Sequence, residues 1–342
     1  MKILVTGANS LLGANLIEEL SRAGHQVRAM VRHAGSLPFT GEQVEVFEGE
    51  ITSPGVAERA ASGCGGLIHL AANTSQHFQP YARYAEVNVE GTRLVSAAAI
   101  AQGVRRFVYV SSANTLGYGS LESPGTEAAS IRYPFTRSGY ATSKLAAETL
   151  VLKAGETGGM EVVVVNPCFM IGAYDNKPGS GRILLRALGR RLVWAPPGGK
   201  NFIGARDAAK AVIRALFDAE AGERYLLGAE NLSYPDFYRR VRRVTGERFR
   251  IVVIPASIMK AIGMIGSLFA QAGIPNAFHL NNMRILCVKN YYSAHKAAAR
   301  LSLSPTPIEA AVSEATAWFR LRGMTGSATT VKINQPINAS QP

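Results

Sequence analysis

The sequence has few cysteines, and their pattern fits neither a disulfide framework nor a zinc site. Only Cys64, Cys168 and Cys287 occur in 342 residues. Their number is odd, their spacings are wide and no CxxC pair exists, so we predict no disulfide and no metal. The apolar run Ile3–Val5 follows Met1 almost at once and leaves no room for a leader peptide. We therefore expect a protein of the reducing cytoplasm.

Long apolar runs are also lacking. The most apolar late segment, residues 258–274, contains Lys260 and Gln271 and is shorter than the roughly 20 residues that a membrane-spanning helix needs. We predict no membrane span and interpret this segment as a helix of the core. The alternative is a helix that lies on a membrane or lines an apolar substrate entrance, so peripheral membrane contact stays open.

Acidic residues are fewer than basic ones, and 37 Lys and Arg against 24 Asp and Glu give a formal charge of +13. A phosphate-rich partner is one interpretation, and general solubility is the other. The basic clusters at residues 190–191 and 239–243 do not alternate with aromatic side chains as a single-strand-binding groove would. We predict no nucleic acid partner, because an anionic cofactor needs only a few of these charges.

What the sequence does contain is a regular alternation of short apolar runs and amphipathic stretches in its first half. Strand-like runs cover Lys2–Thr6, Gln26–Val31, Val44–Phe47, Gly66–Leu70, Arg106–Ser111 and Glu161–Val165. Helix-like stretches cover Leu11–Ala23, Val56–Ala61, Tyr81–Gln102 and Gly139–Ala154. This order predicts an α/β protein, with a Rossmann-type doubly wound parallel sheet covered by helices on both faces.

After Pro167 the alternation breaks down, which predicts a smaller mixed α/β C-terminal substrate domain. We assign residues 1–167 to the dinucleotide-binding domain, with parts of 201–230 returning to it, and 168–322 mainly to the substrate domain. Later helices are expected at Arg206–Asp218, Tyr234–Thr245, Ser257–Ala272, Ser293–Leu301 and Ile308–Phe319, and strands at Arg224–Leu227 and Arg250–Ile254. Residues 323–342 become polar without an apolar period, so we predict a disordered tail.

The turn after the first strand is the predicted cofactor site. Gly7 permits a tight turn, and Gly13 lets the following helix pack closely on the sheet. The free N–H groups at that helix N-terminus suit a pyrophosphate. The residues of this predicted contact are Gly7, Asn9, Ser10, Leu11, Leu12 and Gly13. Ser10 stands where a glycine usually lets the backbone approach the phosphate, and it fits if its φ is ordinary.

Further cofactor contacts follow the next strands. Arg32 comes after the second strand, where an acidic residue would bind the ribose of NAD; an arginine suits a 2′-phosphate. NADP(H) is therefore favoured and NAD(H) stays possible, since Arg32 could be a solvated loop charge. Glu50 and Ile51 are placed to meet the adenine. The small residues of Leu70–Ala72 allow close approach of the cofactor.

The predicted catalytic residues are Ser112, Tyr140 and Lys144. Tyr140 and Lys144 are four positions apart on a predicted helix and so share a face. An ammonium group and a cationic nicotinamide nearby would lower the tyrosine pKa from its ordinary value near 10. Ser112 ends the fifth strand, where its hydroxyl can hold the substrate oxygen while Tyr140 exchanges the proton. Spacing alone would equally fit an exposed helix face.

Together these features resemble the extended short-chain dehydrogenase/reductase superfamily, which includes the NAD-dependent epimerases and dehydratases. The matching stretches are TGANSLLG at 6–13, GLIHLAANTS at 66–75, NVEGT at 88–92, FVYVSSANTLG at 107–117, YATSK at 140–144 and VNPCFMIG at 165–172. The stretch at 27–32 and the one leading from Asn166 to Gly172 look most like the dihydroflavonol-reductase and 3β-hydroxysteroid-dehydrogenase branch. Leu116 and Glu50 replace the usual tyrosine and aspartate, which blurs the subgroup.

The resemblance implies the roles of several more residues. It selects Ser112 over Ser111 as the catalytic serine and places Ser111 beside the cofactor with Tyr140 and Lys144. It makes Asn88 a cofactor-side residue, although an amide that packs helices is an equal alternative. Cofactor contacts along the nicotinamide would come from Pro167, Phe169 and Met170. It also implies dimerisation through the stretches 81–102 and 139–154, although a monomer is equally compatible with their alanines.

Three functions stay open. The first is an NAD(P)-dependent oxidoreductase that interconverts a secondary alcohol and a ketone or aldehyde on a bulky, fairly apolar substrate, with Tyr140 as general acid and base. The second is a nucleotide-sugar epimerase or dehydratase with bound NAD, for which Arg182 and Arg186 could meet a diphosphate. The third is a non-catalytic dinucleotide sensor, which would not need the Ser-Tyr-Lys set.

Overall fold

A seven-stranded parallel sheet forms the centre of the larger layer. In this computed structural model, residues 1–38, 41–77, 79–274 and 276–325 are described. The strand order is β10-β6-β5-β4-β1-β2-β3, and every neighbouring pair is parallel. The strands are β1 Lys2–Thr6, β2 Gln26–Val31, β3 Val44–Glu48, β4 Gly66–His69, β5 Arg106–Val110, β6 Glu161–Pro167 and β10 Arg224–Leu227. The predicted doubly wound sheet is confirmed, and its carboxyl ends share one edge.

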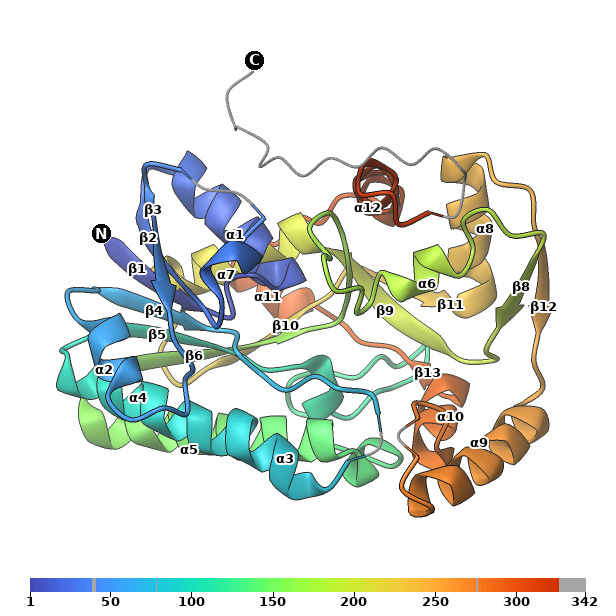
Figure 1. The fold of residues 1–342 in the computed structure, drawn as a ribbon, viewed down its shortest axis with the longest axis horizontal. Coiled ribbons are helices and arrows are strands. Elements are labelled where there is room, and N and C mark those ends of the chain that lie inside the picture. The colour runs from blue at the N-terminus through green and yellow to red at the C-terminus, as the bar shows by residue number, and fades with distance from the viewer. Residues whose placement is uncertain (39–40, 78, 275, 326–342) are drawn as a thin grey trace.

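Helices cover both faces of this sheet (Figure 1). One face packs against α1 Leu11–Arg22, α7 Ala205–Asp218 and α11 His295–Arg300, whose apolar side chains share one core with the strands. The other face packs against α2 Val56–Ala61, α4 Gly91–Ala101 and α5 Gly139–Gly158. Strands such as β6 are buried on both faces, which explains why they read as continuous apolar runs rather than alternating ones.

The stretch predicted as one helix over 81–102 contains three segments. Helix α3 covers Tyr81–Ala85, a π-helical turn covers Glu86–Glu90, and α4 continues from Gly91. A π turn adds a residue to the helix and is often found at functional sites. Here it contains Asn88, whose buried amide bonds to other elements of the site.

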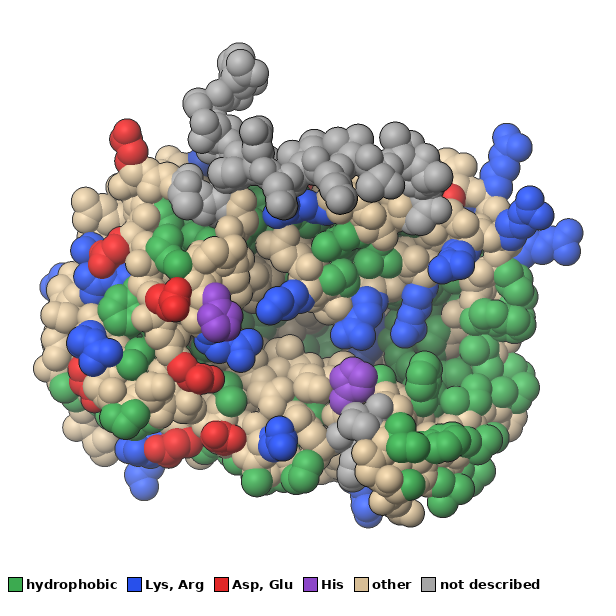
Figure 2. Space-filling view, in the orientation of Figure 1, with side chains coloured by type: hydrophobic (Ala, Val, Ile, Leu, Met, Phe, Trp, Pro, Cys, Tyr) green, Lys and Arg blue, Asp and Glu red, His purple; other side chains and the backbone are tan. Residues whose placement is uncertain are grey.

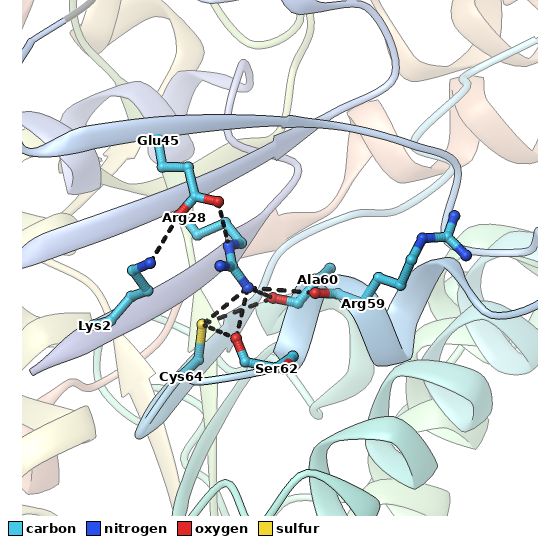
Figure 3. A network of polar contacts seen from close by, with 7 residues as sticks. All are labelled: Lys2, Arg28, Glu45, Arg59, Ala60, Ser62 and Cys64. Atoms are coloured by element: carbon cyan, nitrogen blue, oxygen red, sulfur yellow. Dashed lines mark hydrogen bonds and ion pairs between the residues drawn. The ribbon is translucent and has the colours of Figure 1, made fainter.

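A polar network joins the first three strands to the end of α2 (Figure 3). The Arg28 guanidinium donates to the carbonyl oxygens of Ala60 at 2.8 Å and Ser62 at 2.7 Å, and it pairs with Glu45 at 3.0 Å. Lys2 completes the network through Glu45 at 2.9 Å, and this bond is the largest cause that lowers the Glu45 pKa. Arg28 thus satisfies carbonyls at a helix C-terminus, a structural role.

The smaller layer follows β6 and has its own apolar core. Its strands are β7 Phe169–Ile171, β8 Leu192–Ala195, β9 Gly199–Gly204, β11 Glu230–Ser233, β12 Arg250–Val253 and β13 Lys289–Asn290. Its helices are α6 Arg182–Leu185, α8 Tyr234–Thr245, α9 Ala256–Gln271, α10 Leu280–Cys287 and α12 Ile308–Leu321. Phe202, Phe237 and Phe319 are fully buried in its core. The chain returns to the large sheet twice, through α7 with β10 and through α11.

Several features bear on the remaining expectations. The three cysteines are free thiols. Within the described ranges, no set of side chains could hold a metal ion, and no helix has the length and apolarity needed to cross a membrane. Of the predicted tail at 323–342, all but residues 323–325 lies outside the described residues.

Candidate active site

The glycine turn joins β1 to α1 at the carboxyl edge of the sheet. Gly7 has a φ of +67°, and a Cβ added there would lie 2.8 Å from the Ala71 nitrogen. A Cβ on Gly13 would lie 2.5 Å from the carbonyl oxygen of Gly7. Both positions therefore require glycine, the first for its backbone conformation as well as for space, and the second for helix packing.

The N-terminus of α1 offers free donors to an anion. Ser10 is its N-cap with an ordinary φ of −76°, and its side chain accepts from the Gly13 N–H at 3.1 Å. Ser10 therefore has the ordinary φ that lets a serine replace the usual glycine at this position. The N–H groups of Leu11 and Leu12 have no acceptor among the described residues. Two unpaired N–H groups and the positive end of the helix dipole fit a pyrophosphate.

The other predicted nucleotide contacts lie along the same edge. Arg32 directly follows β2 and is exposed, and no described carboxylate pairs with it. Glu48, at the end of the neighbouring strand β3, accepts from the Ala34 N–H at 2.7 Å. Glu50 is exposed, while Ile51 is buried against Gly91 of α4. Asn9 donates to the Ser36 hydroxyl at 2.9 Å and so ties the glycine turn to the loop after β2.

The segment after β4 completes this wall. Leu70 and Ala71 donate their N–H groups to Thr6, one to its carbonyl and one to its hydroxyl, both at 3.2 Å. Leu70, Ala71 and Ala72 are partly buried. Asn88 reaches this segment from the π turn: its amide oxygen accepts from the Asn73 N–H at 2.6 Å. The backbone beside the glycine turn is thereby fixed.

Asn88 also bonds to the catalytic helix. Its amide nitrogen donates to the Ser143 hydroxyl of α5 at 2.9 Å and to the Asn73 carbonyl at 3.2 Å. Both ends of its side chain are engaged within the protein and the residue is buried. These bonds support the second of its two expected roles, an amide that positions neighbouring elements.

Ser112 and Tyr140 come together at the carboxyl end of β5. Ser112 lies two residues after the strand, and its hydroxyl accepts from the Asn114 N–H at 3.2 Å. Tyr140 is in the first turn of α5, with its side chain near that of Ser112. Desolvation raises the pKa of Tyr140, and the Ser112 hydroxyl only partly offsets that rise. The lowering expected from Lys144 is not seen in this structure.

Lys144 lies one turn further along α5 and is buried beneath Tyr140. Its ammonium donates to the Val110 carbonyl at 2.7 Å and sits 4.2 Å from the centre of the Tyr109 ring. Burial lowers the pKa of Lys144 to about 7, and the charge of Glu148 opposes this. The ammonium is therefore held by a carbonyl and a ring face instead of an ion pair.

Behind Lys144, a buried carboxylate joins three elements. Glu148 accepts from the Ser111 hydroxyl at 2.7 Å, from the Thr115 hydroxyl at 3.2 Å and from the Asn166 amide at 3.1 Å. It also pairs with Arg224 at 3.2 Å. Ser111 thus donates its hydroxyl to Glu148, whereas the Ser112 side chain lies near Tyr140. This difference is consistent with the implied choice of Ser112 as the catalytic serine.

The residues implied along the nicotinamide follow the same edge. Pro167 ends β6, and Phe169 and Met170 are partly buried in β7. Strand β7 pairs with β9, and β9 pairs with β13, so the smaller layer reaches the catalytic edge. Tyr292 locks this junction by donating its hydroxyl to the Ala113 carbonyl at 2.7 Å, directly after Ser112.

This junction brings in two residues that sequence reasoning missed. Lys200 of β9 is buried, and burial lowers its pKa to about 8. It pairs in register with Asn290 of β13, whose amide donates to the Asn114 side chain at 3.5 Å. The Asn290 amide oxygen is buried without a partner among the described residues. Of these two residues, only Lys200 has a recognisable sequence pattern, a lysine before an apolar run. That pattern is too common in proteins to identify a site residue.

A cavity of about 320 Å³ opens beside Tyr140. One wall is formed by residues 75–77, Gln79 and the start of α5, and the other by α9 and α10. The second wall includes Ser267, Gln271 and Arg284. The exposed Arg182 and Arg186 of α6 do not line it. Tyr140, whose phenol could exchange a proton, therefore lines a space large enough for a small organic molecule.

Comparison with known proteins fits this geometry. Residues 3–228, which contain the glycine turn and the Ser-Tyr-Lys set, match the family described as "NAD dependent epimerase/dehydratase family". The chain belongs to that family. The resemblance predicted from the motifs is thereby confirmed, and with it the dependence of the family on a nicotinamide dinucleotide.

Relatives of similar length carry names of reductases and sterol enzymes. The chain is 31% identical over 330 residues to a Synechocystis sp. protein named "Putative dihydroflavonol 4-reductase", covering 93% of this chain and 94% of that protein. It is 29% identical over 341 residues to "Sterol demethylase protein B" of Methylococcus capsulatus, covering 95% and 100%. The crystal structure of gox2253 superposes with a TM-score of 0.80 at 28% identity, covering 94% and 99%.

Proposed function

We propose that this protein is an NAD(P)-dependent oxidoreductase that interconverts a secondary alcohol and a ketone or aldehyde on a bulky, fairly apolar substrate. The observation that carries the proposal is the position of Tyr140, which lines the cavity and lies near the Ser112 side chain, on the same sheet edge as the glycine turn. The names of the two relatives, a dihydroflavonol reductase and a sterol enzyme, support the substrate class.

In this proposal each residue has a defined task. The bound nicotinamide supplies or accepts the hydride. Ser112 holds the substrate oxygen by a hydrogen bond, and Tyr140 donates a proton to that oxygen during reduction and removes it during oxidation. The raised pKa keeps the Tyr140 phenol protonated at neutral pH, which suits the proton donor of a carbonyl reduction. We assign to protonated Lys144, on the same face of α5, the task of favouring the phenolate, an effect that the Tyr140 pKa of this structure does not show.

NADP(H) is the proposed cofactor because Arg32 is an exposed cation without a described carboxylate partner at the end of β2. Replacing Arg32 with Glu should shift the preference from NADPH to NADH, measured as the ratio of the two dissociation constants. Arg105→Glu is the matched control, since Arg105 is exposed just before β5, at the opposite edge of the sheet. An unchanged ratio in the Arg32 variant would count against the NADP assignment.

The reaction is tested by turnover of a panel of ketones, aldehydes and secondary alcohols with each nicotinamide. Tyr140→Phe should lower kcat by about 10²-fold or more, since positioned acid–base catalysis contributes about 10²–10⁴-fold. Tyr81→Phe is the control, because the Tyr81 side chain is 48% exposed on α3. Full turnover by the Tyr140 variant would refute the assignment of this residue.

A nucleotide-sugar epimerase or dehydratase is the second candidate, favoured by the polarity of the cavity wall. Gln76, Asn281 and Asn282 lie there with Arg137 and Arg284, a set suited to sugar hydroxyls and a diphosphate. Conversion of a nucleotide sugar without net change in added NADPH, together with tightly bound NAD in the purified protein, would select this candidate over the first.

A further inference from the structure

Helix α9 presents an apolar face to solvent. Ile258, Ile262, Ile265 and Phe269 recur at helical spacing, and their side chains are 50%, 38%, 56% and 52% exposed. Met264 and Leu268 widen the same face at 56% and 66% exposure. Of the nineteen exposed large apolar side chains described, eight lie between Ile258 and Phe278. Figure 2 shows the apolar surface at the lower right, where Figure 1 places α9 and α10.

The opposite face of α9 already has its packing partner. A Cβ on Gly263 would lie 2.7 Å from the Cα of Leu280, and one on Gly266 would lie 2.4 Å from the Phe278 carbonyl oxygen. The helix is thus in close backbone contact with α10 and the turn before it. A soluble helix packed on one side normally has polar residues on the other, so the apolar outer face requires a separate explanation.

The chain segment that carries this face contains no acidic residue. From Arg248 to Ile308 the chain has no Asp or Glu. The same stretch contains seven cations, namely Arg248, Arg250, Lys260, Arg284, Lys289, Lys296 and Arg300. Lys260 is exposed on α9 itself, and Arg250 is exposed on β12, the strand that precedes this helix. Apolar side chains with flanking cations are the composition that binds an anionic bilayer surface.

We propose that the outer face of α9, with the exposed Arg250 and Lys260, docks this protein on the surface of an anionic lipid bilayer. A second copy of the chain is a poorer occupant, because a two-fold interface would pair this face with an identical one, and residues 248–308 have no carboxylate to neutralise its cations. The face is also continuous with the candidate site: Ser267, Ala270 and Gln271 on the inner side of α9 line the cavity beside Tyr140. Docking would place the mouth of that cavity at the lipid surface.

The test measures sedimentation of the full chain with lipid vesicles and needs no turnover, so it is independent of the reaction proposed above. Vesicles of phosphatidylcholine are compared with vesicles of phosphatidylcholine and phosphatidylglycerol. The protein should bind the second kind, and raising the salt concentration should weaken that binding. No binding to phosphatidylglycerol vesicles would overturn the proposal.

Two variants separate the apolar and the charged contributions. Leu268→Glu should lower the vesicle partition coefficient by about tenfold or more, because a leucine that would enter the bilayer on docking is replaced by a carboxylate facing anionic lipid. Leu321→Glu is the matched control on α12, where the side chain is 49% exposed. Arg250→Gln combined with Lys260→Gln should weaken binding to phosphatidylglycerol vesicles by about tenfold or more, at about 1 kcal/mol per charge.

Fold and oligomeric state are monitored in parallel. Each variant should keep the cofactor affinity and unfolding midpoint of the unaltered protein, since the substituted side chains are exposed. Equal vesicle binding by Leu268→Glu and Leu321→Glu would overturn the proposal. So would ultracentrifugation showing a dimer that Leu268→Glu dissociates, because the face would then be an interface between copies.

Discussion

Replacing Lys144 with Met should stabilise the protein while abolishing its activity. The Lys144 side chain is 2% exposed, and its ammonium bonds to a carbonyl rather than a carboxylate. Burial lowers its pKa from the ordinary value of 10.5 to about 7. A lysine pKa lowered by folding is a cost to stability, because the unfolded chain binds the proton more tightly.

The size and pH range of this cost follow from the two pKa values. Below pH 7 the ammonium is charged in both states and the full cost, about 5 kcal/mol at about 1.4 kcal/mol per pKa unit, opposes folding. The cost declines as the pH rises from about 7 to 10.5, where both states are neutral. Losing the hydrogen bond to the Val110 carbonyl lowers stability by about 1–3 kcal/mol. The free energy of unfolding of Lys144→Met should therefore rise by roughly 2 kcal/mol or more at low pH.

Urea unfolding of both proteins at several pH values measures the difference directly. Lys200 and every other group are common to the two proteins, so the difference curve isolates Lys144. That difference should shrink by about 1.4 kcal/mol per pH unit above pH 7. Lys210→Met, on the exposed side of α7, is the control and should change stability by less than about 0.5 kcal/mol. A variant that is less stable at pH 6, or a difference that does not vary with pH, would refute the reasoning.

Three further predictions concern single residues of the site. Gly13→Ala should lower the free energy of unfolding by about 1–3 kcal/mol and weaken NADPH binding, because the added Cβ would lie 2.5 Å from the Gly7 carbonyl oxygen. Gly35→Ala is the control and should change neither, since a Cβ there has nothing within 4 Å. Equal unfolding midpoints for the two variants would contradict this prediction. Glu148→Leu should lower the free energy of unfolding by about 3–5 kcal/mol, because it leaves the groups that donate to Glu148 unpaired, and Glu148→Gln should lower it much less. Calorimetry that shows equal losses of stability would exclude these hydrogen bonds as the cause. Lys200→Met should raise the free energy of unfolding below pH 8 and lose this advantage as the pH rises towards 10.5, and a constant advantage would argue against burial as its origin.

Much of the fold could be predicted because the local pattern and the final environment agree. The strands of the large sheet are buried on both faces, so each appears in the sequence as a compact apolar run between amphipathic helices. The smaller layer was predicted less completely. Strands β8, β9 and β13 are two to six residues long, lie among glycines and prolines, and obtain their pairing partners from distant segments. No local period marks such strands.

For the site, the sequence by itself determined the glycine turn, the Ser112, Tyr140 and Lys144 set, and their shared edge. These follow from glycine sterics, helical spacing and the rule that parallel strands end together. Only the tertiary structure decided which groups share the buried space: that Lys144 bonds to the Val110 carbonyl, and that Asn290, the register partner of Lys200, reaches the Asn114 side chain two residues after Ser112. Burial and hydrogen bonding depend on residues far apart in the chain, so no pattern within one segment can specify them.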